Sequence, residues 1–407
     1  MQLSEELQWR GFWNQTTFTD DKLVDSEKFT LYLGTDPSAD SLHVGHLAVY
    51  MMARHFLERG HKVFLLVGGG TGMIGDMRDT EERTLLSYAE IEHNKQALKA
   101  QVSQIFAGRD FTLVDNADWL SHVTLLPFLR DIGKNFNMAE LVNREFFKAR
   151  IGNGKGLSFA EFTYTLLQGY DFWHLFRQHG VNLQIGGSDQ WGNLLSGVEL
   201  IRKKENAEVY AMTAPLLINK STGRKFGKSE GGAVWLDEAK TSVYAFYQFW
   251  LNTDDESAID YMKIFTMLDR QTIDAVAENH AVNPGARSAQ KILAREVTDI
   301  VHGVARRESV ERVTEVLFGD APLQSLTDQD IELLTHEIPQ APVGRRVVEA
   351  LTDSGVARSN GEARRLLAAG AISLDGVKIT DDQLISQPVL IKKGKNTFIV
   401  VTKGGER

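Results

Sequence analysis

In the first half of the chain, segments with the apolar pattern of β-strands are followed by segments with the apolar spacing of helices. Residues 28–34 (KFTLYLG) and 182–187 (NLQIGG) read as buried strands that end in glycine. Residues 61–67 (HKVFLLV) form a continuous apolar run, which is typical of a central parallel strand. Apolar side chains recur at helical spacing over 41–60 and from about 188 to 203. Strand, helix and strand in this order predict an α/β fold with a parallel sheet.

Helical patterns dominate the rest of the chain. They cover about 82–106, 125–147, 158–179 and 242–318. Residues 219–232 are rich in lysine and glycine and have no apolar period, so we expect an exposed loop there. Residues 337–343 (EIPQAPV) contain two prolines and are the best candidate for a linker. An amphipathic helix and short strands are expected after it.

Composition excludes several classes of protein. The 407 residues include no cysteine, which rules out disulfides, thiolate metal sites and a catalytic thiol, and favours a reducing compartment. We therefore expect a cytoplasmic protein. The N-terminus does not resemble a secretory signal, and no apolar run approaches the roughly 18 residues of a membrane span.

Charge is distributed unevenly along the chain. The formal net charge is -9, but residues 340–407 contain 11 basic and 7 acidic residues and carry +4. The preceding 339 residues therefore sum to -13. The positive charge of residues 340–407 is therefore compatible with a contact to RNA phosphates, although the rest of the chain is acidic.

The motif His43-Val44-Gly45-His46 falls at the predicted start of a helix. Free backbone donors and the helix dipole favour a phosphate there, and imidazoles add further donors. A surface histidine pair is the alternative. A metal site is less favoured because two histidines supply only two ligands.

The glycines at 70, 72 and 75 formally match a dinucleotide-binding fingerprint after a strand. The residues that follow lack the apolar period of the helix that this fingerprint must open. NAD binding is therefore a minor alternative.

The segment Lys225-Phe226-Gly227-Lys228-Ser229 resembles a phosphate-binding P-loop only in part. A P-loop has four residues between its glycines, whereas only three residues separate Gly223 from Gly227. Two lysines in a loop could still close on a polyphosphate. A solvated basic loop is the alternative.

Tyr164, Gln168 and Asp171 follow helical spacing and share one face of a helix. A phenol, an amide and a carboxylate on an otherwise apolar helix suggest a pocket for a small polar ligand. An ordinary exposed stripe is the alternative.

Together these segments resemble the bacterial-type tyrosyl-tRNA synthetases of class I. Residues 43–46 (HVGH) match the HIGH signature and residues 225–229 (KFGKS) match the KMSKS signature, in the family's order and spacing. Residues 6–11, 36–42, 183–193 and 230–237 also match, and 359–376 resemble an S4-type RNA-binding domain.

The resemblance implies a Rossmann-like parallel-sheet catalytic domain over 1–222, with a connective insertion near 115–155. It further implies an α-helical domain with the KFGKS loop over 223–336 and a small α+β S4-like domain over 340–407. A homodimer, tyrosine tRNA, L-tyrosine and ATP with Mg²⁺ are the implied partners and substrates. No membrane partner or protein-bound metal is expected.

The resemblance also assigns residues to the chemistry, in which tyrosine's carboxylate attacks the α-phosphorus of ATP. His43, His46, Lys225, Lys228, Ser229 and Ser38 are the implied contacts to the phosphates. Tyr32 and Asp171 are implied for the phenolic hydroxyl, Tyr164, Gln168 and Asp76 for the ammonium group, and Gln190 for the carboxylate region. Gly34, Asp36, Gly45, Gly187, Asp189 and Lys228 are implied for ATP.

Three positions depart from the family's usual pattern. The loop that starts at Gly75-Asp76 lacks the usual lysine, and we expect Arg83, with Arg78 as the alternative, to supply that charge. Leu33 replaces a common cysteine and Val49 a polar residue, so we expect slightly weaker contacts to the adenylate ribose.

Other functions stay open at this point. A tryptophanyl-type synthetase is the nearest, although Tyr32 and Asp171 suit a hydroxyl better than an indole N–H. A tRNA-binding relative without catalysis and an NAD-dependent oxidoreductase are more distant.

Overall fold

The computed structural model describes residues 1–76, 84–152, 156–218, 223, 226–229, 232–319 and 321–403. The chain forms two compact units. The first comprises Met1–Ser242 and Phe249–Val301, and the second comprises Val243–Gln248 and His302–Arg407. The predicted domain boundaries near 222 and 336–340 stay predictions.

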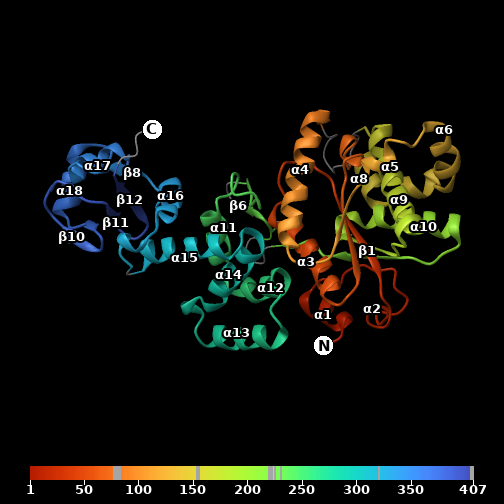
Figure 1. The fold of residues 1–407 in the computed structure, drawn as a ribbon, viewed down its shortest axis with the longest axis horizontal. Coiled ribbons are helices and arrows are strands. Elements are labelled where there is room, and N and C mark those ends of the chain that lie inside the picture. Colours follow the sequence, from red (N-terminus) through yellow and green to blue (C-terminus); the bar gives the residue numbers. More distant parts are fainter. Residues whose placement is uncertain are drawn as a thin grey trace. The chain divides into compact units, whose positions relative to one another are not determined.

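A five-stranded parallel sheet organises the first unit, in the order β3-β2-β1-β4-β5 (Figure 1). This confirms the α/β fold that the sequence predicts. Because the order reverses between β1 and β4, a crevice opens at their carboxyl ends. The strands are β1 (Thr30–Thr35), β2 (Lys62–Val67), β3 (Thr112–Asp115), β4 (Leu183–Gly187) and β5 (Tyr210–Ala214).

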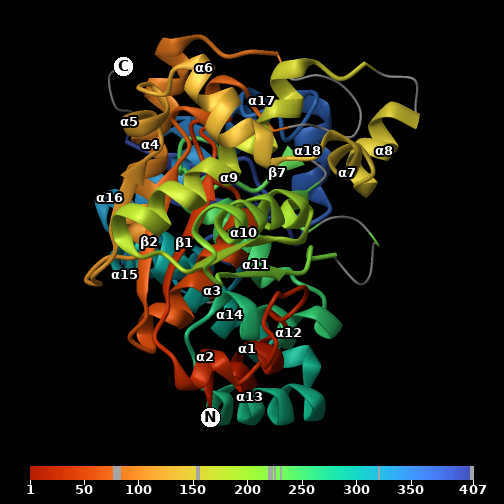
Figure 2. The same ribbon diagram turned by 90° about the vertical axis from the view of Figure 1, so that its right-hand side faces the viewer.

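Helices cover both faces of this sheet. In Figure 1, α3 (Val44–Glu58) and α4 (Tyr88–Ile105) lie on one side, and α9 (Phe159–His179) and α10 (Trp191–Glu205) lie on the other. Figure 2 shows α9 and α10 side by side. The α9 face packs on Tyr32, Phe64 and Leu66 of the sheet. Two short helices, α1 (Leu3–Arg10) and α2 (Leu23–Ser26), precede β1.

Local capping explains where α9 begins and ends. Ser158 accepts a hydrogen bond from the Glu161 amide at 3.2 Å, and Gly180 takes a left-handed conformation with φ 67° at the other end. Serine and glycine are the residues that favour these two positions. The predicted helix over 158–179 is therefore confirmed with its boundaries.

The single helical stretch predicted over 125–147 is wrong. Residues 125–135 are helical without interruption, and Pro127 and Gly133 both have helical backbone angles. The helix is broken at Phe136 and Asn137, which are extended, and Asn137 then caps the next helix, so the segment folds as several short helical elements. They are α5 (Ala117–Leu120), α6 (Leu125–Pro127), η2 (Phe128–Ile132), η3 (Gly133–Asn135), α7 (Met138–Val142) and α8 (Glu145–Gly152).

Helices follow β5, as the sequence predicts. A small pair of strands, β6 (Lys228–Ser229) and β7 (Gly232–Ala233), comes first. The helices are α11 (Val243–Leu251), α12 (Asp255–Phe265), α13 (Arg270–Val282), η5 (Pro284–Ala286), α14 (Ser288–His302) and α15 (Val304–Phe318). None of the helices in the described ranges has the length and apolarity needed to cross a bilayer.

The second unit contains a mixed sheet with the order β10-β9-β11-β12-β8 and its own apolar core. The linker predicted around 337–343 is wrong in part, because residues 340–342 form strand β8 beside β12. β8 lies at the sheet edge, where a proline is tolerated. The remaining elements are η6 (Leu323–Ser325), α16 (Asp328–Glu337), β8 (Gln340–Pro342), α17 (Val347–Asp353), α18 (Asn360–Ala368), β9 (Ile372–Leu374), β10 (Val377–Ile379), β11 (Val389–Lys393) and β12 (Thr397–Thr402).

Candidate active site

A cavity of about 490 Å³ lies in the first unit, and the carboxyl ends of β1 and β4 contribute to its lining. It gathers residues from β1, α3, α9 and β4 that are far apart in the sequence. Most of the residues predicted from the sequence line this one cavity. These are Tyr32, Gly34, Asp36, Ser38, His43, Gly45, His46, Asp76, Tyr164, Gln168, Asp171, Gly187, Asp189 and Gln190.

The two signature segments meet at this cavity. The Val44 amide donates to the Val234 carbonyl at 3.0 Å, so the segment after residues 225–229 pairs with the start of α3. Gly227 has φ 85°, and a Cβ atom there would lie 2.7 Å from the Val44 side chain. Glycine is required at 227 by both the backbone conformation and this close approach.

Backbone hydrogen bonds fix the rings of the two histidines at the start of α3. The Gly45 amide donates to Nδ1 of His43 at 3.0 Å, and the His43 amide donates to Nδ1 of His46 at 3.2 Å. Because Nδ1 accepts in each ring, the neutral form carries its proton on Nε2. Burial and the neighbouring His43 lower the pKa of His46 to about 3. His46 therefore offers a neutral N–H at physiological pH.

Asp171 is buried at one end of the cavity. Its carboxylate accepts hydrogen bonds from Asn116 Nδ2 at 2.9 Å and from Trp119 Nε1 at 2.7 Å. Burial raises the pKa of Asp171 to about 7, although the two donors favour the ionised form. Burial and Asp171 also raise the pKa of Tyr32 well above its usual value. A carboxylate and a phenol thus lie together in a desolvated pocket.

A chain of hydrogen bonds links Asp171 to Tyr164. Asn116 also donates to the Thr71 hydroxyl at 2.8 Å, which donates to Asp36 at 2.7 Å. The Tyr164 hydroxyl donates to the other oxygen of Asp36 at 2.8 Å. Because the Tyr164 hydroxyl donates its proton to Asp36, its oxygen is free to accept a hydrogen bond from a cationic ligand.

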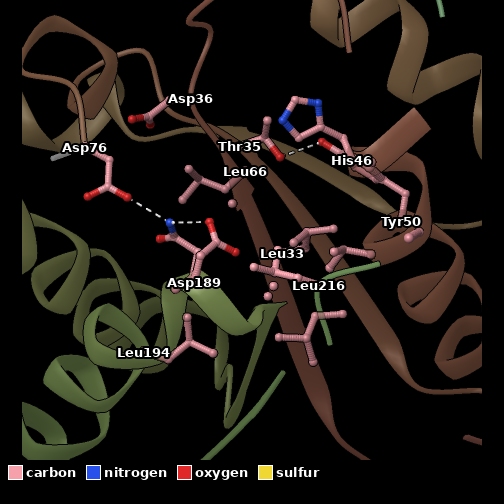
Figure 3. Close-up of a pocket in the computed structure, with 18 of the residues that line it drawn as sticks. Leu33, Thr35, Asp36, His46, Tyr50, Leu66, Asp76, Asp189, Leu194 and Leu216 are labelled. Carbon is pink, nitrogen blue, oxygen red and sulfur yellow. Dashed lines mark hydrogen bonds between the residues drawn. The ribbon is translucent and has the colours of Figure 1, made fainter. Parts of the chain in front are cut away.

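Asp76 lies across the cavity from His46 and Tyr50 (Figure 3). Its carboxylate accepts from Gln190 Nε2 at 2.7 Å and from Asn193 Nδ2 at 3.4 Å. These amides fix the carboxylate without neutralising it, so it remains suited to an ammonium group.

The opposite part of the cavity is apolar. Leu33, Val49 and Leu216 line it, which places both residues that depart from the family's pattern at the cavity wall. Figure 3 shows the hydrogen bond of 2.9 Å from the Tyr50 hydroxyl to Thr35 beside them. Neither Leu33 nor Val49 has a side chain that can hydrogen-bond to a sugar hydroxyl, so the weaker ribose contacts expected from the sequence stay a prediction.

Part of the predicted site lies outside the described residues. This applies to Lys225 and to both Arg83 and its alternative Arg78. The backbone of Lys228 and Ser229 forms β6, but their side chains are not among the described groups. Their neighbours Phe226 and Gly227 do line the cavity.

Sequence reasoning missed several pocket residues. Asn116, Trp119, Thr71, Asn193 and Gln184 contact or line the site, but the sequence analysis assigned none of them a role. Gln184 and Asn193 lie within the matched segment 183–193, and Thr71 lies between two glycines of the fingerprint, whereas no motif marks Asn116 or Trp119. Asn116 follows directly after β3, and a polar residue at the carboxyl end of a parallel strand is the one signal that points to it.

Comparison with protein families covers nearly the whole chain. Residues 25–319 match the family described as tRNA synthetases class I (W and Y). Residues 330–406 match the family described as the Tyrosine–tRNA ligase SYY-like C-terminal domain.

Individual proteins give the same result. The chain is 44% identical over 413 residues to the tyrosine–tRNA ligase of Limosilactobacillus reuteri (strain DSM 20016), which covers 99% of this chain and 98% of that protein. It is 43% identical over 412 residues to that of Limosilactobacillus fermentum (strain NBRC 3956 / LMG 18251), covering 99% and 97%. The crystal structure of a C-terminally truncated Aspergillus nidulans mitochondrial tyrosyl-tRNA synthetase superposes with a TM-score of 0.69 at 30% identity, covering 76% of this chain and 92% of that one.

Proposed function

Because the chain belongs to the tyrosyl-tRNA synthetases of class I over nearly its whole length, we propose that its cavity binds L-tyrosine and ATP as one continuous site. The chain is a tyrosine–tRNA ligase. It activates tyrosine with ATP to tyrosyl-adenylate and pyrophosphate, and then transfers tyrosine to the 3′ end of its tRNA.

In the first step, an oxygen of tyrosine's carboxylate bonds to the α-phosphorus of ATP, and the bond from that phosphorus to the bridging oxygen of pyrophosphate breaks. In the second step, a ribose hydroxyl of tRNA attacks the acyl carbon and AMP leaves. Neither step needs a protein nucleophile, so the site must orient the reactants and stabilise negative charge.

The phosphates lie, in this proposal, at the start of α3. Nε2–H of His43 and of His46 donates to phosphate oxygens, and the hydroxyl of Ser38 adds a third donor. Lys225, Lys228 and Ser229 hold the pyrophosphate from the other signature, and Arg83 supplies the charge of the usual loop lysine. The meeting of both signatures at Gly227 and Val44 supports this arrangement.

Tyrosine occupies the α9 side of the cavity. Asp171 and Tyr32 hold its phenolic hydroxyl, and Asp76, Tyr164 and Gln168 hold its ammonium group. Gln190 lies at its carboxylate. Asp36, Asp189 and the backbone of Gly34, Gly45 and Gly187 contact ATP. The ribose lies beside Leu33 and Val49, whose side chains offer it no hydrogen bond. Mg²⁺ enters with ATP as part of that substrate.

The observation that carries this assignment is the pairing of a buried carboxylate, Asp171, with a buried phenol, Tyr32, in the cavity of a class I synthetase. Phenylalanine would leave the Tyr32 hydroxyl without a partner and would place an apolar edge against the buried carboxyl group of Asp171, so the pocket should reject it.

Amino-acid-dependent exchange of pyrophosphate into ATP tests the function. We expect exchange with tyrosine and at least about a hundredfold less with phenylalanine or tryptophan, because neither offers a hydroxyl to Asp171 and Tyr32. Exchange with tryptophan but not tyrosine would instead favour the tryptophanyl-type alternative. Absence of exchange with any amino acid would favour the RNA-binding alternative.

Residues 340–407 bind the tRNA in this proposal, as the S4-like resemblance implies. Their charge of +4 contrasts with the acidic remainder of the chain. Arg364 and Arg365 on α18 are exposed and offer guanidinium groups to phosphates. The cytoplasmic location and the three-domain division, with a catalytic domain over 1–222 and a helical domain over 223–336, stay predictions.

The insertion after β3 forms the homodimer interface in this proposal. Large apolar side chains are exposed along residues 125–159. Exposed apolar groups of this size favour association between subunits. They are Leu125, Leu126, Leu129, Met138, Ile151 and Phe159.

Replacing Leu126 by aspartate is expected to convert the dimer to monomers. Leu126 is 76% exposed, and a charge there would be desolvated in an apolar interface, which we expect to weaken association by about tenfold to a hundredfold. Sedimentation velocity at several concentrations measures this. Val282→Asp is the matched control because Val282 is 87% exposed on α13 outside the insertion. Equal behaviour of both variants would contradict the interface.

A further inference from the structure

Two buried polar atoms on the strands that line the cavity have no hydrogen-bond partner among the described residues. They are the hydroxyl oxygen of Tyr32 and the side-chain carbonyl oxygen of Gln184. Tyr32 is 1% exposed and Gln184 is 2% exposed. Most buried polar atoms in proteins are hydrogen-bonded, so such a pair requires an explanation.

Their positions place the two side chains next to each other. Tyr32 on β1 and Gln184 on β4 are partners in the parallel register. Partners in register point to the same face of a sheet. For Tyr32 this face is the one covered by α9, where its ring lies 5.4 Å from that of Phe172. Both residues line the cavity.

An apolar residue would fill the position of Gln184 at a lower cost. Its neighbours on β4, Leu183 and Ile185, are apolar and buried, and an unpaired amide in such a strand destabilises the ligand-free protein. The side-chain oxygen therefore makes no hydrogen bond that stabilises the described fold, and it is available for a ligand in the cavity.

We propose that Gln184 is a specificity-determining residue that reads the phenolic hydroxyl of tyrosine together with Tyr32 and Asp171. A hydroxyl both donates and accepts one hydrogen bond. Tyr32 donates to the substrate oxygen, and the substrate's hydrogen is shared between Gln184 Oε1 and Asp171. The substrate hydroxyl therefore complements the two unpaired atoms, because the Tyr32 hydroxyl can donate to it and Gln184 Oε1 can accept from it.

Asp171 keeps a second lone pair on each oxygen, so the substrate hydrogen can lie between Asp171 and Gln184. Each of its oxygens already accepts one hydrogen bond, from Asn116 and from Trp119. Gln184 Oε1 accepts none in the described structure. The inference rests on the proposed function, since it adds a residue to the same tyrosine pocket.

The variant Gln184→Met tests this role because methionine has nearly the same length and no acceptor oxygen. We expect kcat/KM for tyrosine-dependent pyrophosphate exchange to fall about tenfold to a hundredfold, with the much lower value for phenylalanine unchanged. The KM for ATP should stay the same, and the Tm of the ligand-free protein should not fall. Leu183→Met is the control, since Leu183 is buried on the same strand but does not line the cavity.

Gln184→Glu keeps an oxygen at the same place and should retain the preference for tyrosine over phenylalanine that Gln184→Met loses. Equal losses for tyrosine and phenylalanine, or no loss for tyrosine, would overturn the proposal. A loss of Tm in Gln184→Met with an unchanged ratio of the two amino acids would show a structural role instead. Wild-type enzyme without tyrosine-dependent exchange would contradict the proposed function itself, before any variant is compared.

Discussion

Asp171→Ala is expected to reduce tyrosine-dependent pyrophosphate exchange by about a thousandfold. The change removes the charged acceptor for the substrate hydroxyl and leaves the donors of Asn116 and Trp119 unpaired in a buried site. A hydrogen bond to a charged group contributes about 1.5–3 kcal/mol, and stranding buried donors adds to the loss. The measurement is kcat/KM for tyrosine at saturating ATP.

Gln178→Ala is the matched control, because Gln178 is exposed near the end of the same helix, α9. It should keep full activity. Thermal unfolding of both variants separates loss of the pocket from loss of the fold. If Asp171→Ala retained more than a tenth of the wild-type value, Asp171 could not be the main reader of the hydroxyl.

Removal of residues 340–407 is expected to separate the two steps of the reaction. Adenylate formation should stay within about twofold of wild type, because every residue assigned to tyrosine and ATP lies before residue 230. Charging of tRNA should fall at least about a hundredfold, because in our proposal the basic module contacts the tRNA phosphates. The assays are pyrophosphate exchange and tRNA aminoacylation on the same preparation.

The apolar core within residues 341–401 makes this deletion practicable, and the Aspergillus nidulans relative was crystallised in a C-terminally truncated form. A full-length companion is the double variant Arg364→Glu with Arg365→Glu, both exposed on α18. The double variant should lose tRNA aminoacylation but keep pyrophosphate exchange. The control Lys62→Glu reverses an exposed charge in the first unit and should keep both activities. Normal charging by the truncated enzyme would show that the module is not the tRNA-binding part.

Local patterns in the sequence predicted the sheet and the stripe on α9. Tyr164, Gln168 and Asp171 are separated by multiples of a helical turn, so their common face follows from spacing alone. The single helix predicted over 125–147 failed because the chain is extended at Phe136 and Asn137, where Asn137 caps a new helix that the apolar period does not reveal.

Residues whose role depends on tertiary contacts could not be predicted in this way. Asn116 reaches Asp171 only because β3 and α9 are brought together by the strand order. Gln184 lies in an apolar strand and joins the pocket through its register with Tyr32. The approach of Gly227 to Val44 likewise joins segments about 180 residues apart in the sequence.

The chain of hydrogen bonds from Tyr164 through Asp36, Thr71 and Asn116 to Asp171 limits how this pocket can acquire a new amino acid during evolution. Each member hydrogen-bonds to the next, so a replacement at Asp171 also changes the partners of residues that, in our proposal, bind the ammonium group. We therefore expect variants with one change to be poor enzymes for both the old and the new amino acid. A shift of specificity requires linked replacements, which protects the accuracy of translation against random mutation.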